Sequence, residues 1–303
     1  MSGGPRSSVS LVTAAYAMQR ELPRTLRSLS TGYQRDPPAA RWELIVIDNG
    51  SPEPLAEPKG WADPAVTLRL VRLEGEASLA AALNHGLGLA QGELVGVWID
   101  GARMASPGLL GACARAAALH PRPVIATRNY HLGHGLQHSE GMRGYDQQAE
   151  DALLASIGWP EGAERLAEIS TPEQADPGGA LIETNALFMT RALWGELGGF
   201  DTRFAGPGGG AVNADMFLRA CAAPGTQLIR ILGEGTFHQF HGGVTTGAGQ
   251  ERAAWLLKMG SKQYFRLRGR PLRAVRDLGW LYDSRRGLVH PPAMQEAADD
   301  RAG

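Results

Sequence analysis

The chain has 303 residues, which is enough for one large domain or two modest ones. Hydrophobic residues make up 43% of it and charged residues 20%, the composition of an ordinary globular protein. Because the formal net charge is −1, no global attraction to nucleic acid or to anionic membranes is expected, and no nucleic-acid partner is predicted.

The elements of the first half alternate between strands and helices. Apolar, β-branched runs predict strands at 9–15, 42–48, 66–73, 93–99 and 123–127. Helical patterns predict helices around 22–29, at 78–91 and at 107–119. This alternation predicts an α/β fold, a Rossmann-like and mostly parallel sheet with helices on both faces.

The second half is less regular. It predicts helices at 146–157, 191–197, 213–222 and 250–268, and strands at 181–190 and 227–232. A disordered tail is expected from about residue 290. The pattern therefore divides the chain into a regular part at 1–127, a less regular part at 128–245, and a C-terminal helical segment with a flexible tail at 246–303.

Cellular location follows from cysteine use and from the length of apolar runs. Cys113 and Cys221 lie in Ala-rich segments and are expected to be free thiols, as in a reducing cytoplasm. No apolar run approaches the ~18 residues that a membrane-spanning helix needs. The sequence predicts a cytoplasmic protein without a transmembrane segment.

Polar residues follow three of the predicted strands, at Thr13–Tyr16, Asp48–Ser51 and Asp100–Arg103. In a doubly wound sheet, ligands bind beyond the carboxyl ends of the strands. We therefore expect these three segments to form one site.

Five segments occur in a characteristic order: SLVTAAY, ELIVIDNGSPEP, LNHGLGLAQGELVGVWIDGARMASPG, LFMTRALWGELGGFDTRF and NADMFLR. Together they resemble family 2 glycosyltransferases of the GT-A fold over roughly residues 8–245. The resemblance implies transfer of a sugar from a nucleotide-sugar donor, with UDP favoured, and inversion at the anomeric carbon. It implies a glycan or lipid-linked glycan acceptor, as in polysaccharide biosynthesis, and a divalent metal, Mn²⁺ or Mg²⁺.

The resemblance implies that residues 1–127 form the nucleotide-sugar-binding half and residues 128–245 the acceptor-binding half. It also implies residues that bind the nucleotide. Tyr16 would stack on the base and Asp48 would accept its ring N–H, with backbone contacts from Thr13 and Ala14. Asn84 matches an Asn that the family often places near the nucleotide. Two structural alternatives stay open, that Asp48 only caps the following turn and that the helix around Asn84 only packs on the sheet.

Asp100 matches the aspartate that the family associates with its metal, because carboxylate oxygens suit a hard divalent cation. The family pattern is Asp-x-Asp, but this chain has Ala102 in place of the second carboxylate. Arg103 could instead offset diphosphate charge, or lie solvated on a loop. A further ligand is expected from His238 or His241, in a glycine-flanked loop after the last core strand.

The general base is the position where the chain departs most from its relatives. An inverting transferase needs a carboxylate to accept the proton of the acceptor hydroxyl. The family's usual position carries Asn213, which leaves Asp215 as the predicted base and Glu183 as a less favoured substitute. The alternative for Asp215 is an acidic residue of a helix's first turn, stabilised by the helix dipole.

Two further segments have open interpretations. The glycine-rich run 206–210 is either a lid over the donor or a passive turn. The basic residues from Lys262 to Arg276 favour a solvated helix face, with peripheral contact to a membrane or phosphorylated lipid as the alternative.

Two rival functions remain. One is a catalytically degenerate nucleotide-sugar-binding protein, because two family carboxylates are missing. The other is a nucleotide-dependent oxidoreductase, which is disfavoured because no G-x-G-x-x-G motif follows the first strand.

Overall fold

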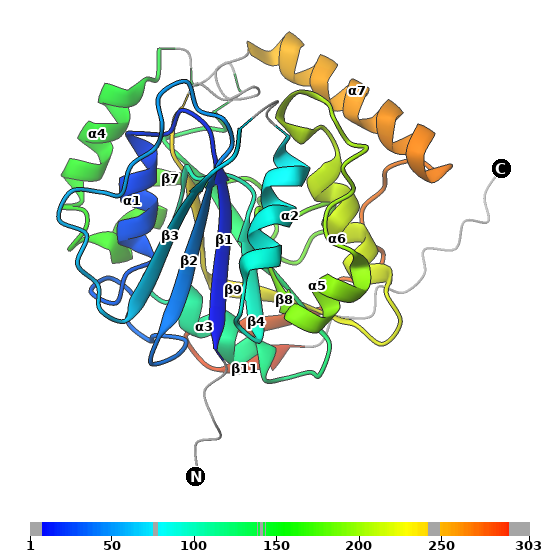
Figure 1. Cartoon of the computed structure of the whole chain (residues 1–303), viewed down its shortest axis with the longest axis horizontal. Coiled ribbons are helices and arrows are strands. Elements are labelled where there is room, and N and C mark those ends of the chain that lie inside the picture. The colour runs from blue at the N-terminus through cyan, green and yellow to red at the C-terminus, as the bar shows by residue number, and fades with distance from the viewer. Residues whose placement is uncertain are drawn as a thin grey trace.

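A computed structural model describes residues 8–74, 78–137, 139, 142, 144–241 and 249–290. Within these residues one eleven-stranded sheet runs through the molecule, with strand order β11-β10-β9-β6-β8-β4-β1-β2-β3. Strand β5 pairs with β9, and β7 pairs with β6. Figure 1 shows this sheet with helices on both of its faces. The predicted α/β fold, mostly parallel and with helices on both faces, is confirmed.

The strands lie at β1 Val9–Ala15, β2 Trp42–Asp48, β3 Val66–Arg72, β4 Leu94–Trp98, β5 Arg103–Ala105, β6 Pro123–Leu132, β7 Ser170–Pro172, β8 Ala186–Thr190, β9 Gln227–His238, β10 Trp280–Asp283 and β11 Leu288–His290. The helices lie at α1 Glu21–Ser28, α2 Leu79–Leu89, α3 Leu109–Ala117, α4 Gln147–Ser156, α5 Arg191–Leu197, α6 Val212–Ala222 and α7 Gly249–Arg268. Short 3₁₀ segments lie at Ala163–Ile169 and Pro207–Gly209.

Parallel pairing joins β4, β1, β2 and β3, and also joins β6, β9 and β10. Strand β8 lies antiparallel between β4 and β6 and connects the two parallel groups. Every residue of β1, β2 and β4 is buried, as expected for parallel strands covered on both faces.

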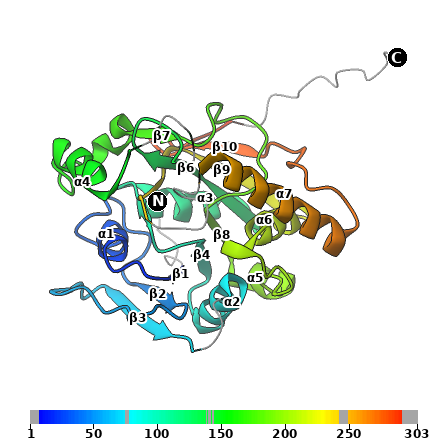
Figure 2. The same ribbon diagram turned by 90° about the horizontal axis from the view of Figure 1, so that it is seen from above.

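The core forms two layers, one on each face of the sheet. Leu22 and Leu26 of α1 and Leu109 of α3 pack in one layer. Leu83 of α2 and Phe217 of α6 pack in the other. Figure 2 shows α1 and α4 on the opposite side of the sheet from α2, α5 and α6. Helix α2 approaches β1 closely because Gly86 has no side chain, where a Cβ would lie 2.3 Å from Val12 Cγ1.

Helix ends follow local capping rules. Ser78, Asp146 and Thr190 accept a hydrogen bond from the first turn of α2, α4 and α5, respectively. Gly198 ends α5 in the left-handed conformation, with a φ of 70°. These caps explain why the predicted helix boundaries agree with the structure to within a few residues.

The structure adds elements that the sequence did not predict. Strand β6 extends to Leu132, β9 extends to His238, and the predicted C-terminal helical segment also contributes β10 and β11 to the sheet edge. Among the described residues, no helix is both long and apolar enough to cross a membrane. The expected tail beyond 290 lies outside the described residues.

Candidate active site

The ends of β1 and β2 bring the predicted nucleotide-binding residues to one edge of the sheet. Ala15 pairs with Asp48 in the parallel register, and Ala15 O accepts a hydrogen bond from Asn49 N–H. Tyr16 follows β1 directly, with 48% of its surface exposed. Its ring is therefore open to a planar ligand beside the Asp48 turn.

Asp48 is 1% exposed and caps the turn that follows β2. Its carboxylate accepts hydrogen bonds from Ser51 N–H at 2.9 Å, Leu55 N–H at 3.1 Å and Arg72 at 3.0 Å. Burial opposes ionisation, but the hydrogen bonds from Ser51 and Leu55 and the Arg72 charge hold the pKa of Asp48 below its usual value. The turn-capping role is shown, and contact with a base stays a prediction.

The side-chain amide of Asn84 has a structural role. Its Nδ2 donates to Phe200 O at 2.8 Å, and its Oδ1 accepts from Phe200 N–H at 2.8 Å. These two bonds fasten α2 to the loop after α5. The packing role that the sequence left open for this helix is thus shown, and contact of Asn84 with the nucleotide stays a prediction.

Asp100, His238 and His241 come together beyond the carboxyl end of β4. Each offers one ligand atom, and these atoms lie within 4.8 Å of one another. His238 Nε2 lies 3.8 Å from Asp100 Oδ2 and 3.1 Å from His241 Nε2. The two histidines, predicted as alternatives, thus both face Asp100. His238 is the last residue of β9, whereas the sequence placed it in a loop.

Gln137 fixes the protonation pattern of His238. Gln137 Nε2 donates to His238 O at 3.0 Å, so its Oε1 faces His238 Nδ1 at 2.6 Å and accepts the proton there. The lone pair of His238 then lies on Nε2, toward Asp100 and His241. Burial, with the nearby charges of Arg103 and His241, holds the pKa of His238 well below its usual value. The neutral imidazole that results is the form that binds metals.

Arg103 is buried and paired, although the sequence also allowed a solvated position. It begins β5, and its Nε donates to Asp100 Oδ2 at 2.9 Å while its Nη1 donates to Asn129 Oδ1 at 2.6 Å. Asp100 also accepts from Ala102 N–H at 2.9 Å. Arg103 therefore orients the carboxylate and adds a positive charge beside it.

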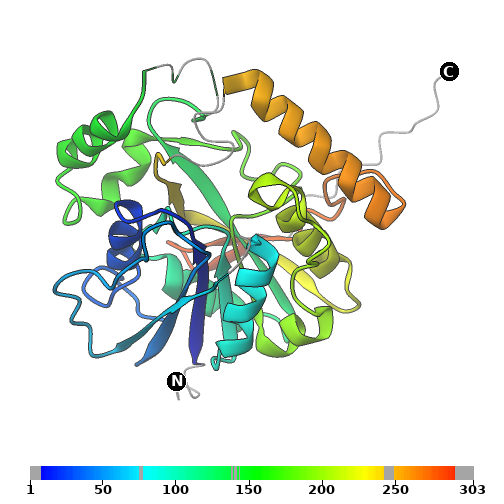
Figure 3. The ribbon, with the colours of Figure 1, turned by 45° about the horizontal axis from the view of Figure 1, so that its top comes forward.

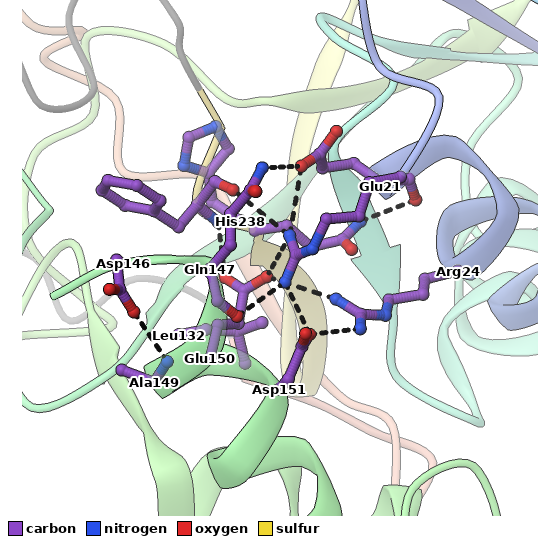
Figure 4. Close-up of polar contacts among 12 residues, drawn as sticks. Glu21, Arg24, Leu132, Asp146, Gln147, Ala149, Glu150, Asp151 and His238 are labelled. Atoms are coloured by element: carbon purple, nitrogen blue, oxygen red, sulfur yellow. Dashed lines mark hydrogen bonds and ion pairs between the residues drawn. The ribbon is translucent and has the colours of Figure 1, made fainter.

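The segment between the two histidines is hydrogen-bonded to helices α1 and α4. Phe240 N–H donates to Glu150 Oε2 of α4, and Gln239 donates to Glu21 O and to Thr25 of α1. Glu150 is fully buried, and Figure 4 shows it with Arg24 and Glu21 of α1.

Glu150 also accepts from Arg20 at 3.2 Å. Burial raises the pKa of Glu150 to about 7, while the Phe240 hydrogen bond and the Arg20 charge oppose that shift. Sequence reasoning missed Glu150, because nothing in its predicted helix signals a contact 90 residues away.

The environment of Asp215 is unlike that of a general base. It is fully buried, and both of its oxygens are occupied: Arg268 Nε donates to Oδ1 at 2.5 Å, and Arg219 Nε and Arg268 Nη2 donate to Oδ2 at 2.8 Å. This ion-pair network joins α6 to α7. The prediction of Asp215 as the general base is therefore corrected, because a carboxylate clamped by two arginines inside the protein cannot reach an acceptor hydroxyl.

Glu183, the less favoured substitute, lines a cavity together with Glu173, Asn129 and Asn185. Asn213, at the family's usual base position, donates to Glu183 Oε2 at 3.2 Å. Burial and the Glu173 charge raise the pKa of Glu183 to about 7, against the nearby Arg103 charge. A carboxylate with such a pKa can accept a proton near neutral pH.

A hydrogen-bonded chain connects this cavity to the Asp100 cluster. Arg103 donates to Asn129, and Asn129 Nδ2 donates to Glu173 Oε2 at 2.6 Å. Asn185 donates to the same oxygen at 3.3 Å. The Asp100 cluster and the carboxylate-bearing cavity are thus neighbours.

The mostly parallel sheet, with a carboxylate–histidine cluster at its strand ends, has the architecture of the GT-A fold. The sequence profile of Glycosyl transferase family 2 matches residues 10–162, about half of the chain. The chain belongs to this family. No match was found among curated proteins.

Solved structures share the fold. S. aureus TarS 1–349 in complex with UDP-GlcNAc superposes with a TM-score of 0.51 and 14% identity, covering 85% of this chain and 66% of that one. The mannosyltransferase PcManGT from Pyrobaculum calidifontis, in complex with GDP-Man and Mn²⁺, gives a TM-score of 0.51 and 19% identity, covering 89% of this chain and 66% of that one. This chain thus spans slightly less than two thirds of either protein.

Proposed function

We propose that the chain transfers a sugar from a nucleoside-diphosphate donor, with UDP favoured, to a glycan or lipid-linked glycan acceptor, with inversion. The observation that carries the proposal is the Asp100, His238 and His241 cluster at the strand ends that meet the Asp48 turn. A diphosphate leaving group needs a divalent cation at this place.

Recognition of the base is assigned to Tyr16 and the Asp48 turn. The exposed Tyr16 ring offers a stacking surface. Uracil presents one N–H between two carbonyl oxygens. Asp48 would accept that N–H once its turn shifts, because in this structure the carboxylate is 1% exposed and accepts from Ser51, Leu55 and Arg72. The preference for UDP is carried over from the family resemblance. Thr13 and Ala14, which lie in the buried part of β1, would contribute through their backbone.

The cation is assigned to the three ligand residues. Two imidazoles and one carboxylate suit Mn²⁺ better than Mg²⁺, because Mg²⁺ prefers oxygen ligands. When bound, the ion would neutralise charge on the departing diphosphate. The chain's own Arg103 adds a fixed positive charge beside Asp100.

The base is assigned to Glu183, held by Asn213. The acceptor hydroxyl oxygen forms the new bond to the anomeric carbon as the bond from that carbon to the diphosphate oxygen breaks. Glu183 takes the hydroxyl proton, and single displacement inverts the anomeric centre. Binding without turnover is the rival function, and the substitution of the second family carboxylate by Ala102 favours it.

The test has two arms. Thermal shifts with a panel of nucleoside diphosphates and nucleotide-sugars, with and without Mn²⁺, should show the largest stabilisation with UDP or a UDP-sugar plus Mn²⁺. Release of the nucleotide in the presence of a glycan acceptor then measures turnover. Nucleotide-sugar binding without release of the nucleotide, with every acceptor tried, would support the catalytically degenerate binding protein. Absence of any nucleotide-dependent thermal shift would reject the assignment of a nucleoside-diphosphate donor.

A further inference from the structure

Helix α7 exposes an unusual amount of apolar surface. Of the eight exposed large hydrophobic side chains in the described part of the chain, four belong to this helix. They are Trp255, Leu257, Met259 and Phe265, with exposed fractions of 54%, 71%, 39% and 55%. Exposed aromatic and aliphatic groups gathered on one element indicate a surface that meets something other than water.

The same helix is strongly basic in a chain whose net charge is −1. It carries Arg252, Lys258, Lys262, Arg266 and Arg268, against one acidic residue, Glu251. Arg268 is neutralised by Asp215 and Asp201, but no ion pair within the described residues involves the other four basic side chains. Exposed Arg270, Arg273 and Arg276 extend the basic surface beyond the helix end.

Basic and apolar side chains share one helical face. Trp255, Lys258, Met259, Lys262, Phe265 and Arg266 recur at spacings of three and four residues, which places them side by side. We call these six residues the basic-aromatic face. Lys258, Met259, Lys262, Phe265 and Arg266 also line a groove closed by Pro271 and Leu272.

The opposite side of α7 is fixed to the body of the protein. Leu256 and Tyr264 are buried, Gln263 donates to Arg203 O, and Arg268 pairs with Asp215 of α6. The basic-aromatic face therefore cannot turn inward without breaking a buried ion pair.

We propose that the basic-aromatic face docks on an anionic phospholipid bilayer. Interfacial helices combine Trp and Phe, which enter the headgroup region, with Lys and Arg, which attract anionic lipid. A second copy of the chain is a poor occupant, because a symmetric contact would bring two sets of uncompensated cations together. The groove between Lys258, Lys262 and Arg266 suits a headgroup phosphate.

The placement of α7 adds a reason for such docking. Figures 1 and 3 show the helix at the end of the molecule toward which β1 runs, opposite the N-terminus. The donor and metal residues lie at the same strand ends. Docking would thus hold the candidate active site near a membrane surface. The proposal concerns binding alone and does not depend on the proposed function.

Sedimentation with vesicles tests the proposal on the full chain. We expect binding to vesicles of phosphatidylcholine mixed with phosphatidylglycerol, weakening as salt rises, and little binding to phosphatidylcholine alone. The variant K258Q/K262Q/R266Q should bind the anionic vesicles roughly 100-fold more weakly. W255A/F265A should lose at least roughly tenfold. Brominated lipid should quench wild-type fluorescence more than that of W255F, because Trp255 enters the interface.

The matched control is R41Q/K59Q/R191Q, which removes the same charge at three exposed positions outside α7. It should bind vesicles within about twofold of wild type, since each exposed charge far from the surface is screened. Equal losses in both triple variants, or equal binding to neutral and anionic vesicles, would overturn the proposal. Lipid-independent self-association abolished by W255A/F265A, or binding to an RNA oligonucleotide without binding to vesicles, would also overturn it.

Discussion

Replacing Asp215 by Asn removes the negative charge that holds Arg219 and Arg268 between α6 and α7. An Asn amide keeps the shape but places an NH₂ donor against a guanidinium donor. Breaking a buried ion pair costs about 3–5 kcal/mol. The side chains of Arg219 and Arg268 are 23% and 17% exposed and can hydrate in part, so we expect the lower end, about 3 kcal/mol. For a chain of 303 residues this lowers Tm by about 5 °C.

The matched variant is Glu183→Gln, because Glu183 is the half-buried carboxylate proposed as the base and is bonded to Asn213 of the same helix as Asp215. It should keep or raise Tm, since it removes the repulsion from Glu173 that burial leaves uncompensated. It should lower kcat by roughly 10²–10⁴, the usual contribution of general base catalysis. Asp215→Asn should instead keep kcat within about threefold of wild type at a temperature where it is folded.

Thermal denaturation and initial rates of nucleotide release, measured on both variants, decide between the two carboxylates. Loss of kcat by 10²-fold or more in folded Asp215→Asn, with Glu183→Gln fully active, would refute the reasoning. Asp215 would then be the base despite its arginine partners. If both variants keep full activity, neither Asp215 nor Glu183 takes the proton, and Glu173 of the same cavity becomes the next candidate.

Three more expectations follow from single contacts. Asp48→Ala should remove most of the thermal shift that UDP gives. For wild type near a hundredfold excess of UDP over Kd, that shift corresponds to roughly 2.7 kcal/mol. An unchanged shift would contradict the contact between Asp48 and the uracil ring. Because the pKa of Glu183 is about 7, above its unfolded value of 4.5, kcat should rise with pH through about 7. The contribution of Glu183 to folding stability should fall as the pH rises from 4.5 to 7. A kcat that does not change with pH would count against Glu183 as the general base. Glu150→Ala should weaken Mn²⁺ binding measured by calorimetry in the presence of UDP, with Glu150→Gln retaining more of it because the Gln oxygen can still accept from Phe240 N–H.

Local signals in the sequence were enough to place the main sheet and the strand-end residues. Runs of β-branched residues ended by turn residues located β1, β2 and β4, because parallel buried strands leave that pattern. The rule that ligands bind at carboxyl strand ends then brought Tyr16, Asp48 and Asp100 to one edge. These residues are near in sequence to the strands that position them.

Contacts between distant segments could not be predicted in this way. Strand β5 has three residues, and its pairing with β9 joins Arg103 to His238. The local pairing of Asp215 with Arg219, four residues along the helix, left one side of the carboxylate open in the sequence, because its second partner Arg268 lies 53 positions along the chain. The amide of Asn84 matched a family position, but its bonds to Phe200 depend on tertiary packing.

The missing second carboxylate has a physical consequence that can be tested at Ala102. Its side chain is fully buried in the core, its N–H donates to Asp100, and its carbonyl accepts from Gln239 N–H at 2.8 Å. The backbone of residue 102 thus links Asp100 to the histidine segment, while its side chain points away from solvent. An aspartate there would bury an unpaired charge.

We therefore expect Ala102→Asp to destabilise the fold by at least about 3 kcal/mol without tightening Mn²⁺ binding. Ala102→Asn, similar in volume and uncharged, separates crowding from charge. Calorimetry with Mn²⁺ and UDP and thermal denaturation are the measurements. Unchanged Tm with tighter Mn²⁺ binding in Ala102→Asp would show that residue 102 reaches the ion. The expected result would mean that the histidine pair takes the place of the second carboxylate, since the core around Ala102 has no room for one.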